Sequence, residues 1–566
     1  MTVGIVGSGP AAAAVEAALD DVGVETSSAD IETFGDSELT VVVGQVGETV
    51  FERASEHALE HDVRWLAVEL GGVGGIPIVD AAVAGFSPET GCYECLSGRV
   101  SANLDPQADP AAAPSAYTSR FAGAVAGREA ARYVAADADI FGRVVVVPFT
   151  EREFLPLPNC ACEGHRSNEI PHEHVERTVE ESLGRAERAI DDQFGIVQEV
   201  GEAESFPVPY YLAHACDTSG FSDVSAARDA AGVAADWNSA FMKALGESLE
   251  RYCAGIYHTE ELEYGPASAV ESAVPPSAFV CQRDSNPEDE LHWVEGERLS
   301  TDESVSLPAE FVLYPPPEKR YRPAVTTGLG LGNSGVEAVL SGLYEVIERD
   351  ATMLSWYSSF EPLALDVEDE TFEMMRSRAS SEGLDVTALL LTQDVDVPVV
   401  AVAVHREEWP RFALGSGADL DVVAAANSAL AEALQNWMEL RGMGPEQAEQ
   451  AMGEIGRYAD LPEAAAEFID AETTIPATSA APAELPQGTA ELETVLDRLA
   501  EADLEGYASR TTTRDVEQLG FEAVRVVVPS AQPLCFGDVY FGERAETVPA
   551  ELGFEPELDR EHHPFP

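Results

Sequence analysis

The chain has 566 residues, of which 33 are basic and 102 acidic, so its formal net charge is −69. A surface this negative repels phosphate, which argues against nucleic acids and anionic membranes as partners. Lys243 and Lys319 are the only lysines, so nearly all basic residues are arginine. Acid enrichment with loss of lysine favours a halophilic protein of a salt-rich cytoplasm, where ions screen the repulsion between carboxylates.

Composition and length also exclude several classes of protein. Hydrophobic residues make up 45% and aromatic residues 8% of the chain, which is too much for a disordered protein. The N-terminal apolar stretch lacks the basic start of a signal peptide, and no apolar run approaches the roughly 18 residues that span a bilayer. We therefore expect a cytoplasmic protein of two to four domains.

The first 20 residues predict a strand, a glycine turn and a helix. An apolar run at 3–6 precedes Gly7 and Gly9, and an alanine-rich stretch continues to about Asp20. Glycines at this spacing allow a sharp turn and direct the start of the helix toward a phosphate. The pattern is typical of the start of a Rossmann-type βαβ unit.

Further apolar strands near 39–43 and 65–68 are consistent with a parallel sheet. Glu25 could meet the ribose of a nucleotide bound at the glycine turn. This fingerprint is weak on its own, and Pro10 occupies the turn, so we favour a structural α/β domain.

Two close pairs of cysteines follow, Cys92 with Cys95 and Cys160 with Cys162. Two pairs of thiols in a reducing compartment are the usual components of a tetrahedral zinc site, because thiolates are soft ligands. The second pair has one intervening residue instead of two, which strains the geometry. The alternative is two unrelated pairs of reduced thiols.

Residues 167–204 are polar and helical in pattern, and we interpret them as a connector. From about Phe206 the pattern predicts a large α+β region that continues to the C-terminus. Within it, the acidic, Pro- and Ala-rich stretches 286–297 and 470–486 resemble surface loops.

Three later segments carry acidic residues at helical spacing: Glu247 with Glu250, Glu345 with Glu348, and Glu432. The first two pairs stand at i, i+3 on one helical face with apolar neighbours, which indicates that this face is covered. Partly buried carboxylates that face each other repel and need a cation. Mg²⁺, which prefers oxygen ligands and bridges to phosphates, is the natural ion.

These segments resemble the YcaO family. The string from Glu337 to Ala351, preceded by Gly-Leu-Gly-Leu-Gly-Asn333, is similar to its nucleotide-binding signature, and residues 244–252 to its upstream Glu-x-x-Glu-Arg motif. Gly415-Ser-Gly417 followed by residues 431–435 resembles the third block.

The resemblance implies that four glutamates coordinate Mg²⁺ bound to ATP phosphates: Glu247, Glu250, Glu345 and Glu348. It also implies a nucleotide pocket that includes Arg251, Asn333, Glu337, Ser341, Glu432 and Gln435. Lys243 stands where the family often has serine, and we hypothesise that it touches phosphate or a site carboxylate. The alternative is a surface pair with Glu247.

The C-terminus, His562-His-Pro564-Phe-Pro566, resembles the proline-rich tail that azoline-forming members place in the active site, although only two of its three prolines are present. A proline-rich segment is already extended, so it loses little entropy when it docks. We therefore expect Pro564 and Pro566 to contribute to catalysis. A frayed terminus is the alternative.

Residues 91–99 resemble the Cys-x-x-Cys-Leu segment of E1/ThiF-related domains, which often precede YcaO domains in azoline biosynthesis. The expected fold is therefore α/β and α+β: a Rossmann-like E1/ThiF-type domain at 1–166, a connector at 167–205, and a YcaO-type ATP-binding domain at 206–566. No winged-helix module for leader-peptide recognition is evident, so a separate leader-binding or dehydrogenase partner is expected. A homodimer stays open.

The expected activity is an ATP-dependent cyclodehydratase that forms thiazoline or oxazoline rings in a ribosomally made peptide. Alternatives are backbone thioamidation, an accessory role in methylthiolation of a ribosomal protein, and an inactive peptide-binding scaffold. The tail argues against the first two, and the retained glutamate pairs argue against the scaffold.

Overall fold

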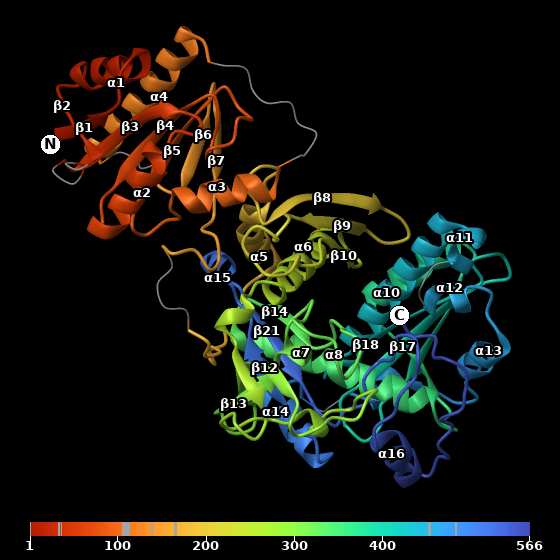
Figure 1. Ribbon diagram of the computed structural model, residues 1–566. Helices are drawn as coiled ribbons and strands as arrows, with labels where there is room; N and C mark the ends of the chain where they lie inside the picture. Colours follow the sequence, from red (N-terminus) through yellow and green to blue (C-terminus); the bar gives the residue numbers. More distant parts are fainter. Residues whose placement is uncertain are drawn as a thin grey trace.

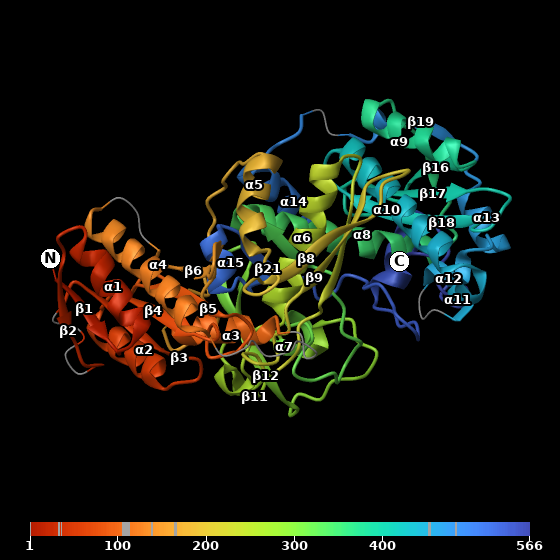
Figure 2. The same cartoon turned by 90° about the horizontal axis from the view of Figure 1, so that it is seen from above.

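The computed structural model describes residues 2–31, 34, 37–104, 114–136, 140–162, 167–450, 454–481 and 484–566. A smaller N-terminal part, coloured red to orange, is joined to a larger part that contains the rest of the chain (Figure 1). Seen from above, the N-terminal part lies at one end of an elongated molecule (Figure 2). None of the helices in the described residues is both long and apolar enough to cross a membrane.

The N-terminal part is built on a seven-stranded sheet of order β2-β1-β3-β4-β5-β6-β7. Neighbours from β2 to β4 are parallel, and those from β4 to β7 are antiparallel. The predicted parallel sheet is thus correct for its first half. The strands are β1 (Thr2–Val6), β2 (Glu25–Ser28), β3 (Leu39–Gln45), β4 (Trp65–Leu70), β5 (Ala81–Phe86), β6 (Arg143–Val146) and β7 (Thr150–Glu153).

Helices cover both faces of this sheet. Apolar residues of α1 and α4 pack with one set of strand residues, and those of α2 and α3 pack with the other set. Figure 1 shows the two pairs on opposite sides of the strands. Because alternate strand residues point to opposite faces, both apolar sets are buried. The helices are α1 (Pro10–Asp20), α2 (Val50–His61), α3 (Tyr93–Ala102) and α4 (Ala116–Val134).

The segment predicted as a helical connector is helical only in part. It forms α5 (Val179–Ala186), with a capping box at Thr178 and Glu181, and a short 3₁₀ turn, η2 (Glu187–Ala189). The prediction is wrong for β8 (Val197–Glu204), which pairs with β9 (Tyr210–Ala215) in a three-stranded sheet completed by β10 (Asp229–Val233). Backbone pairing with β9 decides the conformation of this polar stretch.

A six-stranded sheet forms one side of the larger part, with order β11-β12-β20-β21-β14 and β13 paired to β12. Its strands are β11 (Glu263–Pro266), β12 (Glu290–Arg298), β13 (Glu303–Pro308), β14 (Leu329–Gly332), β20 (Tyr507–Arg510) and β21 (Glu522–Val527). The loop predicted at 286–297 is therefore wrong over most of its length. Leu291 and Trp293 are buried at period two, a strand signal that the acidic composition obscures.

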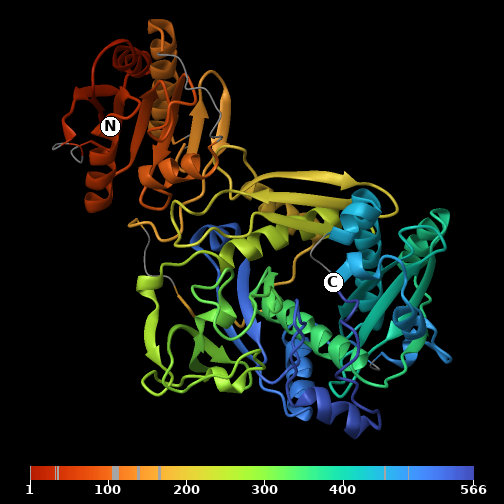
Figure 3. The same cartoon turned by 45° about the vertical axis from the view of Figure 1, so that its right-hand side comes forward.

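A five-stranded sheet of order β18-β17-β16-β15-β19 forms the other side. In Figure 3 its cyan strands and helices stand opposite the green and blue elements of the six-stranded sheet. The strands are β15 (Leu363–Asp366), β16 (Asp385–Leu390), β17 (Val399–His405), β18 (Phe412–Ala418) and β19 (Thr474–Pro476). The stretch predicted as a loop at 470–486 contributes only β19 and the 3₁₀ turn η5 (Ala477–Ser479) where it is described.

Three long helices pack against these sheets: α6 (Trp237–Ala254), α8 (Gly335–Trp356) and α10 (Val422–Met443). Each begins at a capping side chain, Asp236, Ser334 or Asp421, that accepts a hydrogen bond from a backbone amide of the first turn. Each also follows a strand and packs back onto it. The remaining elements are η3 (Thr259–Glu261), η4 (Pro276–Ala278), α7 (Ala309–Val312), α9 (Glu370–Ser381), α11 (Pro445–Gln450), α12 (Glu454–Tyr458), α13 (Glu463–Ile469), α14 (Thr489–Glu501), α15 (Arg514–Leu519) and α16 (Arg544–Leu552).

Glycines set the distance between each long helix and its strand. A Cβ at Gly232 of β10 would lie 2.1 Å from the amide nitrogen of Ala244 in α6. At Gly330 of β14 it would lie 2.1 Å from the carbonyl oxygen of Ala338 in α8. A strand that allows such close contact brings its backbone within reach of the helix side chains.

Candidate active site

The acidic residues of α6 lie against β10. The backbone amide of Ala231 donates to Glu247 Oε2 at 2.6 Å, and Arg251 Nη2 lies 2.5 Å from the other oxygen of Glu247. Arg251 Nη1 donates to the carbonyl of Asp229 at 2.7 Å. Burial raises the pKa of Glu250 well above its usual range, and the nearby charges of Glu345 and Glu247 raise it further. The structure therefore brings the α6 pair close to α8.

The α8 pair is held by the turn before β14 and by strand β18. Glu345 Oε2 accepts from the amide of Gly328 at 2.9 Å. Glu348 Oε1 accepts from the hydroxyl of Ser416 at 2.7 Å and lies 3.4 Å from Arg349 Nη1. Burial raises the pKa of Glu348, against the opposing charge of Arg349.

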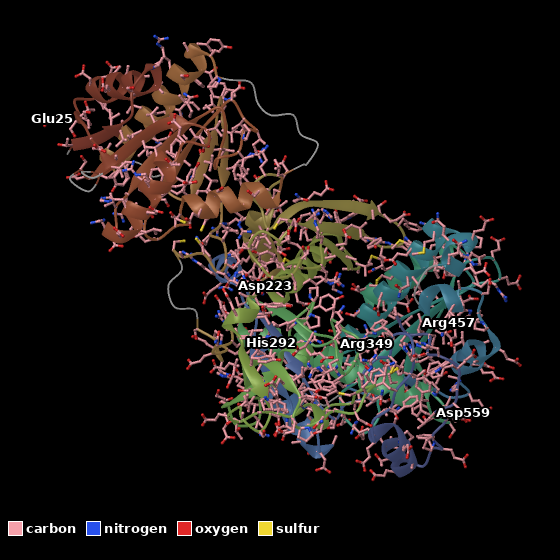
Figure 4. All side chains as sticks on the ribbon, viewed as in Figure 1. Glu25, Asp223, His292, Arg349, Arg457 and Asp559 are labelled. Atoms are coloured by element: carbon pink, nitrogen blue, oxygen red, sulfur yellow. The ribbon has the colours of Figure 1, made fainter. Side chains whose placement is uncertain are left out.

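A carboxylate of α10 completes the cluster. Glu432 Oε2 accepts from the amide of Ser416 at 2.7 Å. Burial raises the pKa of Glu432 to about 7, although the charge of Arg349 opposes the shift. Because Ser416 donates to both Glu348 and Glu432, β18 joins the carboxylates of α8 and α10. Figure 4 labels Arg349 in the interior of the larger part.

The same hydrogen bond thus occurs three times. An amide in or beside β10, β14 or β18 donates to one carboxylate oxygen of the helix that follows, 16 residues later for Glu247, 17 for Glu345 and 16 for Glu432. Sequence reasoning identified the glutamates but missed their amide donors. The signal that could have revealed them is a glycine-containing strand whose amide stands 16 or 17 residues before each glutamate.

This arrangement fits magnesium. The amides of Gly328 and Ser416 each hold one oxygen of Glu345 and of Glu432, which leaves the other oxygen for a further ligand, whereas the second oxygen of Glu247 contacts Arg251. Desolvation and mutual repulsion raise the pKa values of Glu247, Glu250, Glu348 and Glu432, so the charged forms together require a cation. Oxygen-only ligands of this kind suit Mg²⁺. The residues that would hold it are those predicted from the sequence: Glu247, Glu250, Glu345 and Glu348.

Asn333 and Glu337 contact each other at the start of α8. Glu337 Oε2 accepts from the Asn333 amide at 2.8 Å and from its side-chain Nδ2 at 2.9 Å. Asn333 Oδ1 in turn accepts from the hydroxyl of Ser182 at 2.8 Å. The Asn333 side chain therefore orients Glu337 in this structure.

The other predicted pocket residues differ in their surroundings. Solvent reaches the side chains of Lys243 and Ser341, although protein atoms surround the ammonium of Lys243. Desolvation lowers the pKa of Lys243, and the charges of Glu432 and Asp236 oppose that shift, which places its ammonium near a site carboxylate. Gln435 Nε2 donates to Glu439 at 3.0 Å, on the same helix.

The C-terminal residues lie against α8. Arg349 Nη1 donates to the carbonyl of Pro566 at 3.1 Å, and the Phe565 side chain is fully buried. His563 is also buried, with Nε2 2.8 Å from the carbonyl oxygen of Cys535. Arg349 thus contacts both the tail and Glu348. The alternative of a frayed terminus does not describe this conformation.

The four cysteines of the two predicted pairs form one cluster in the described structure, with all sulfurs within 4.8 Å of one another. The Sγ–Sγ distances are 3.8 Å for Cys92–Cys95, 3.5 Å for Cys92–Cys160 and 3.5 Å for Cys95–Cys162. A tetrahedral Zn²⁺ with Zn–S bonds of about 2.3 Å separates its sulfurs by about 3.8 Å. The donor set therefore fits zinc.

Glu25 is separated from the glycine turn. It is paired with Thr2 at the amino end of the parallel strands β1 and β2, whereas Gly7 and Gly9 follow the carboxyl end of β1. Figure 4 shows Glu25 at the outer edge of the N-terminal part. The hypothesis that Glu25 meets a ribose at this turn is therefore wrong, because a nucleotide at a helix N-terminus lies at the carboxyl edge of the strands.

Comparison with known proteins identifies the larger part. The model of the YcaO family, described as "YcaO cyclodehydratase, ATP-ad Mg2+-binding", matches residues 231–532. The chain belongs to the YcaO family. The matched segment begins within β10 and includes α6, α8 and α10, and therefore all five glutamates of the cluster.

Solved structures extend the YcaO likeness beyond this segment. A heterocyclase in complex with substrate and cofactor matches with a TM-score of 0.74 at 20% identity, covering 98% of this chain and 83% of its own. The heterocyclase TruD matches with a TM-score of 0.66 at 19% identity, covering 99% and 82%. These likenesses show that the mixed α/β fold is that of YcaO heterocyclases.

Two archaeal proteins are more similar in sequence. YcaO from Methanopyrus kandleri, bound with AMPPCP and Mg²⁺, is 26% identical with a TM-score of 0.50, covering 63% of this chain and 91% of its own. An uncharacterised protein of Methanothermobacter thermautotrophicus is 28% identical over 315 residues, which is 53% of this chain and 81% of that protein. The chain therefore belongs to a family described as ATP- and Mg²⁺-binding cyclodehydratases.

Proposed function

We propose that the protein is an ATP-dependent cyclodehydratase that converts Cys, Ser or Thr residues of a ribosomally made peptide into azolines. The substrate side chain attacks the preceding backbone carbonyl carbon, and the carbonyl oxygen accepts the γ-phosphoryl group of ATP. Loss of phosphate and a proton from nitrogen then closes the C=N bond. The balance is one ATP converted to ADP and phosphate for each ring formed.

The chain's own residues supply position and charge. Glu247, Glu250, Glu345 and Glu348 would hold Mg²⁺, which neutralises charge on the transferring phosphoryl group. Arg349 stands between Glu348, whose Oε1 is 3.4 Å away, and the Pro566 carbonyl, 3.1 Å away. Lys243, near Glu432, would contact a phosphate or that carboxylate.

The observation that carries the proposal is the contact of the C-terminal tail with Arg349 beside the glutamate cluster. Pro564 and Phe565 are buried, so the tail lies in a fixed place. A peptide carbonyl bound next to the γ-phosphate would face this segment. We therefore assign Pro564 and Pro566 to the site where the amide is activated.

The N-terminal part belongs to the same proposal. We propose an E1/ThiF-related domain at residues 1–166 with zinc on its four cysteines, a connector at 167–205 and the catalytic domain at 206–566. The boundary at 166 lies outside the described residues. A separate leader-binding or dehydrogenase protein would complete the system, and the whole would act in a salt-rich cytoplasm.

Mass spectrometry tests the reaction. The protein is incubated in high KCl with ATP, Mg²⁺ and peptides that contain Cys, Ser or Thr. Loss of about 18 Da per ring, with one phosphate released, is expected from the covalent chemistry. Glu345→Gln should abolish both signals, whereas Glu493→Gln, which changes an exposed carboxylate of α14, should leave them unchanged.

Other outcomes separate the alternatives. A gain of about 16 Da, seen only with a sulfur donor, would mean that sulfur replaced oxygen and would support thioamidation. Peptide binding without ATP turnover would support a scaffold. Either result would overturn cyclodehydration.

A further inference from the structure

The N-terminal part reaches helix α6 through a fully buried ionic cluster. The Arg99 side chain of α3 forms an ion pair with Asp515 of α15, and neither side chain is exposed to solvent. Tyr252 of α6 joins this pair: its hydroxyl donates to Asp515 Oδ2 at 2.7 Å and lies 3.3 Å from Arg99 Nη1. Two further Arg99 hydrogen bonds, at 3.2 and 2.8 Å, go to the carbonyls of Leu155 and Pro156.

The position of Tyr252 links this ionic cluster to the glutamates of α6. Tyr252 follows Glu250 by two residues on the same helix, so fixing its hydroxyl fixes the axial position and rotation of the last turns of α6. A buried ion pair costs desolvation and is a poor source of stability, but it imposes a definite geometry. The guanidinium of Arg514 also lies 3.1 Å from the sulfur of Cys162, which extends the contact to the cysteine cluster.

The connector makes a second contact with the site. Ser182 of α5 is buried, and its hydroxyl donates to Asn333, whose amide group holds Glu337. Arg177 Nη1 donates to the backbone carbonyl of Asn333 at 3.1 Å. The connector therefore contacts Glu337, a predicted nucleotide-pocket residue, through one intervening side chain, that of Asn333.

Arg99, Arg177 and Ser182 all precede residue 231, where the YcaO match begins. We propose that they are positioning residues for the magnesium–nucleotide site: Arg99 sets α6 and its Glu250 through Tyr252, and Arg177 and Ser182 set Glu337 through Asn333. The inference rests on the proposed function only in that the site binds a magnesium nucleotide. It assigns the N-terminal part a direct role in forming that site.

The test measures nucleotide binding, not ring formation. Calorimetric titration of the full chain with AMPPNP at several Mg²⁺ concentrations gives the dissociation constant for Tyr252→Phe and Ser182→Ala. Tyr321→Phe is the control for the first variant, because Tyr321 is also a buried residue whose hydroxyl donates to a carboxylate, that of the partly exposed Asp289, at 2.8 Å. Ser509→Ala, which loses a 2.7 Å hydrogen bond to the carbonyl of Glu295, is the control for the second.

Loss of a residue that orients a metal ligand typically weakens metal binding about 10-fold or more. We expect nucleotide affinity to fall by this factor in Tyr252→Phe and Ser182→Ala. Both controls should bind the nucleotide as the native protein does. The thermal unfolding midpoint without nucleotide should fall no more in the two variants than in their controls. Affinity that falls equally in variants and controls, or is unchanged in all four, would overturn the inference.

Failure of the inference and of the proposed function give different results. Native protein that binds the nucleotide but makes no ring refutes the proposed reaction alone. Variants that bind like the native protein refute the positioning role alone. A native protein that does not bind the magnesium nucleotide refutes both.

Discussion

Single carboxylates in this protein differ in what their oxygens contact. Glu345 and Glu432 accept hydrogen bonds from backbone amides in a partly buried cluster, whereas Glu493 is exposed on a helix surface. The exposed carboxylates keep the protein surface hydrated. The clustered carboxylates repel one another, and a bound cation would remove that repulsion.

Glu250→Gln should therefore have opposite effects without and with metal. Removal of one buried charge relieves repulsion from Glu345 and Glu247, so the metal-free variant should melt a few degrees higher than the native protein. The rise in melting temperature on addition of Mg²⁺ and AMPPNP should disappear, because the variant lacks one of the four proposed Mg²⁺ ligands. Scanning calorimetry in high KCl measures both effects. A metal-free variant that melts lower than the native protein would contradict the repulsion argument.

The buried carboxyl group of Glu69, in the N-terminal part, should make the stability of the protein depend on pH. Burial raises its pKa from 4.5 to about 7, although hydrogen bonds from Gly75 and Tyr93 lower it. The folded form holds the proton more tightly than the unfolded form, so the native protein should lose stability as pH rises from about 4.5 to 7. The loss from this group is on the order of 3 kcal/mol.

Glu69→Gln removes this titration. The variant should match the native protein near pH 4, where the carboxyl is protonated in both states, and should be the more stable of the two at pH 8. Unfolding midpoints measured between pH 4 and 8 give the difference. Parallel curves for the two proteins would show that Glu69 ionises normally.

At the scale of elements, the site depends on how closely each long helix approaches the strand before it. A Cβ at Gly415 of β18 would lie 2.4 Å from both the carbonyl oxygen of Ala429 and the amide nitrogen of Ala433 in α10. These are backbone atoms, so the helix must move. The hydrogen bond from Ser416 to Glu432 spans the same contact and would be displaced with it.

Gly415→Ala should therefore lower stability by about 1–3 kcal/mol, as expected for overpacking, and weaken binding of the magnesium nucleotide. Gly442→Ala is the control, since it lies in α10 and a Cβ there meets no atom within 4 Å. That change should be neutral or stabilising by up to about 1 kcal/mol. Denaturant unfolding and nucleotide titration measure both variants. Equal behaviour of the two would contradict the close-packing argument.

In the proposed reaction, the C-terminal segment should be needed for ring formation and not for nucleotide binding. Removal of Phe565 and Pro566 deletes a buried ring and the acceptor of the Arg349 hydrogen bond. We expect the truncated protein to bind AMPPNP and Mg²⁺ but to form no rings. Binding by calorimetry and products by mass spectrometry test this on one sample. Full cyclisation by the truncated chain would remove the tail from the mechanism.

At the scale of the whole molecule, net charge sets the conditions for folding. With a formal charge of −69, repulsion acts over a Debye length of about 10 Å at 0.1 M salt but only about 3 Å at 1 M. The melting temperature should therefore rise steeply from 0.1 to 2 M KCl. Circular dichroism melts measure it, and a melting temperature independent of salt would contradict the expectation that the acidic surface is adapted to high salt.

Much of the site could be predicted from the sequence because its signals are local. Glutamates at i, i+3 share a helical face in any fold, so Glu247 with Glu250 and Glu345 with Glu348 needed only the period of the helix. The strand, turn and helix of residues 2–20 were predictable for the same reason. Local reasoning failed for β12 and β8, whose conformations depend on neighbouring strands.

Other features needed the tertiary structure, because they join residues far apart in the chain. Cys92 and Cys160 are 68 positions apart, Arg349 and Pro566 217, and Arg99 and Asp515 416. The sequence determined which carboxylates share helix faces and that the surface is strongly acidic. The tertiary structure decided which amides hold those carboxylates, where the tail lies and how the N-terminal part reaches α6. Hydrogen bonds and ion pairs act over about 3 Å, and only the fold brings such distant residues to that distance.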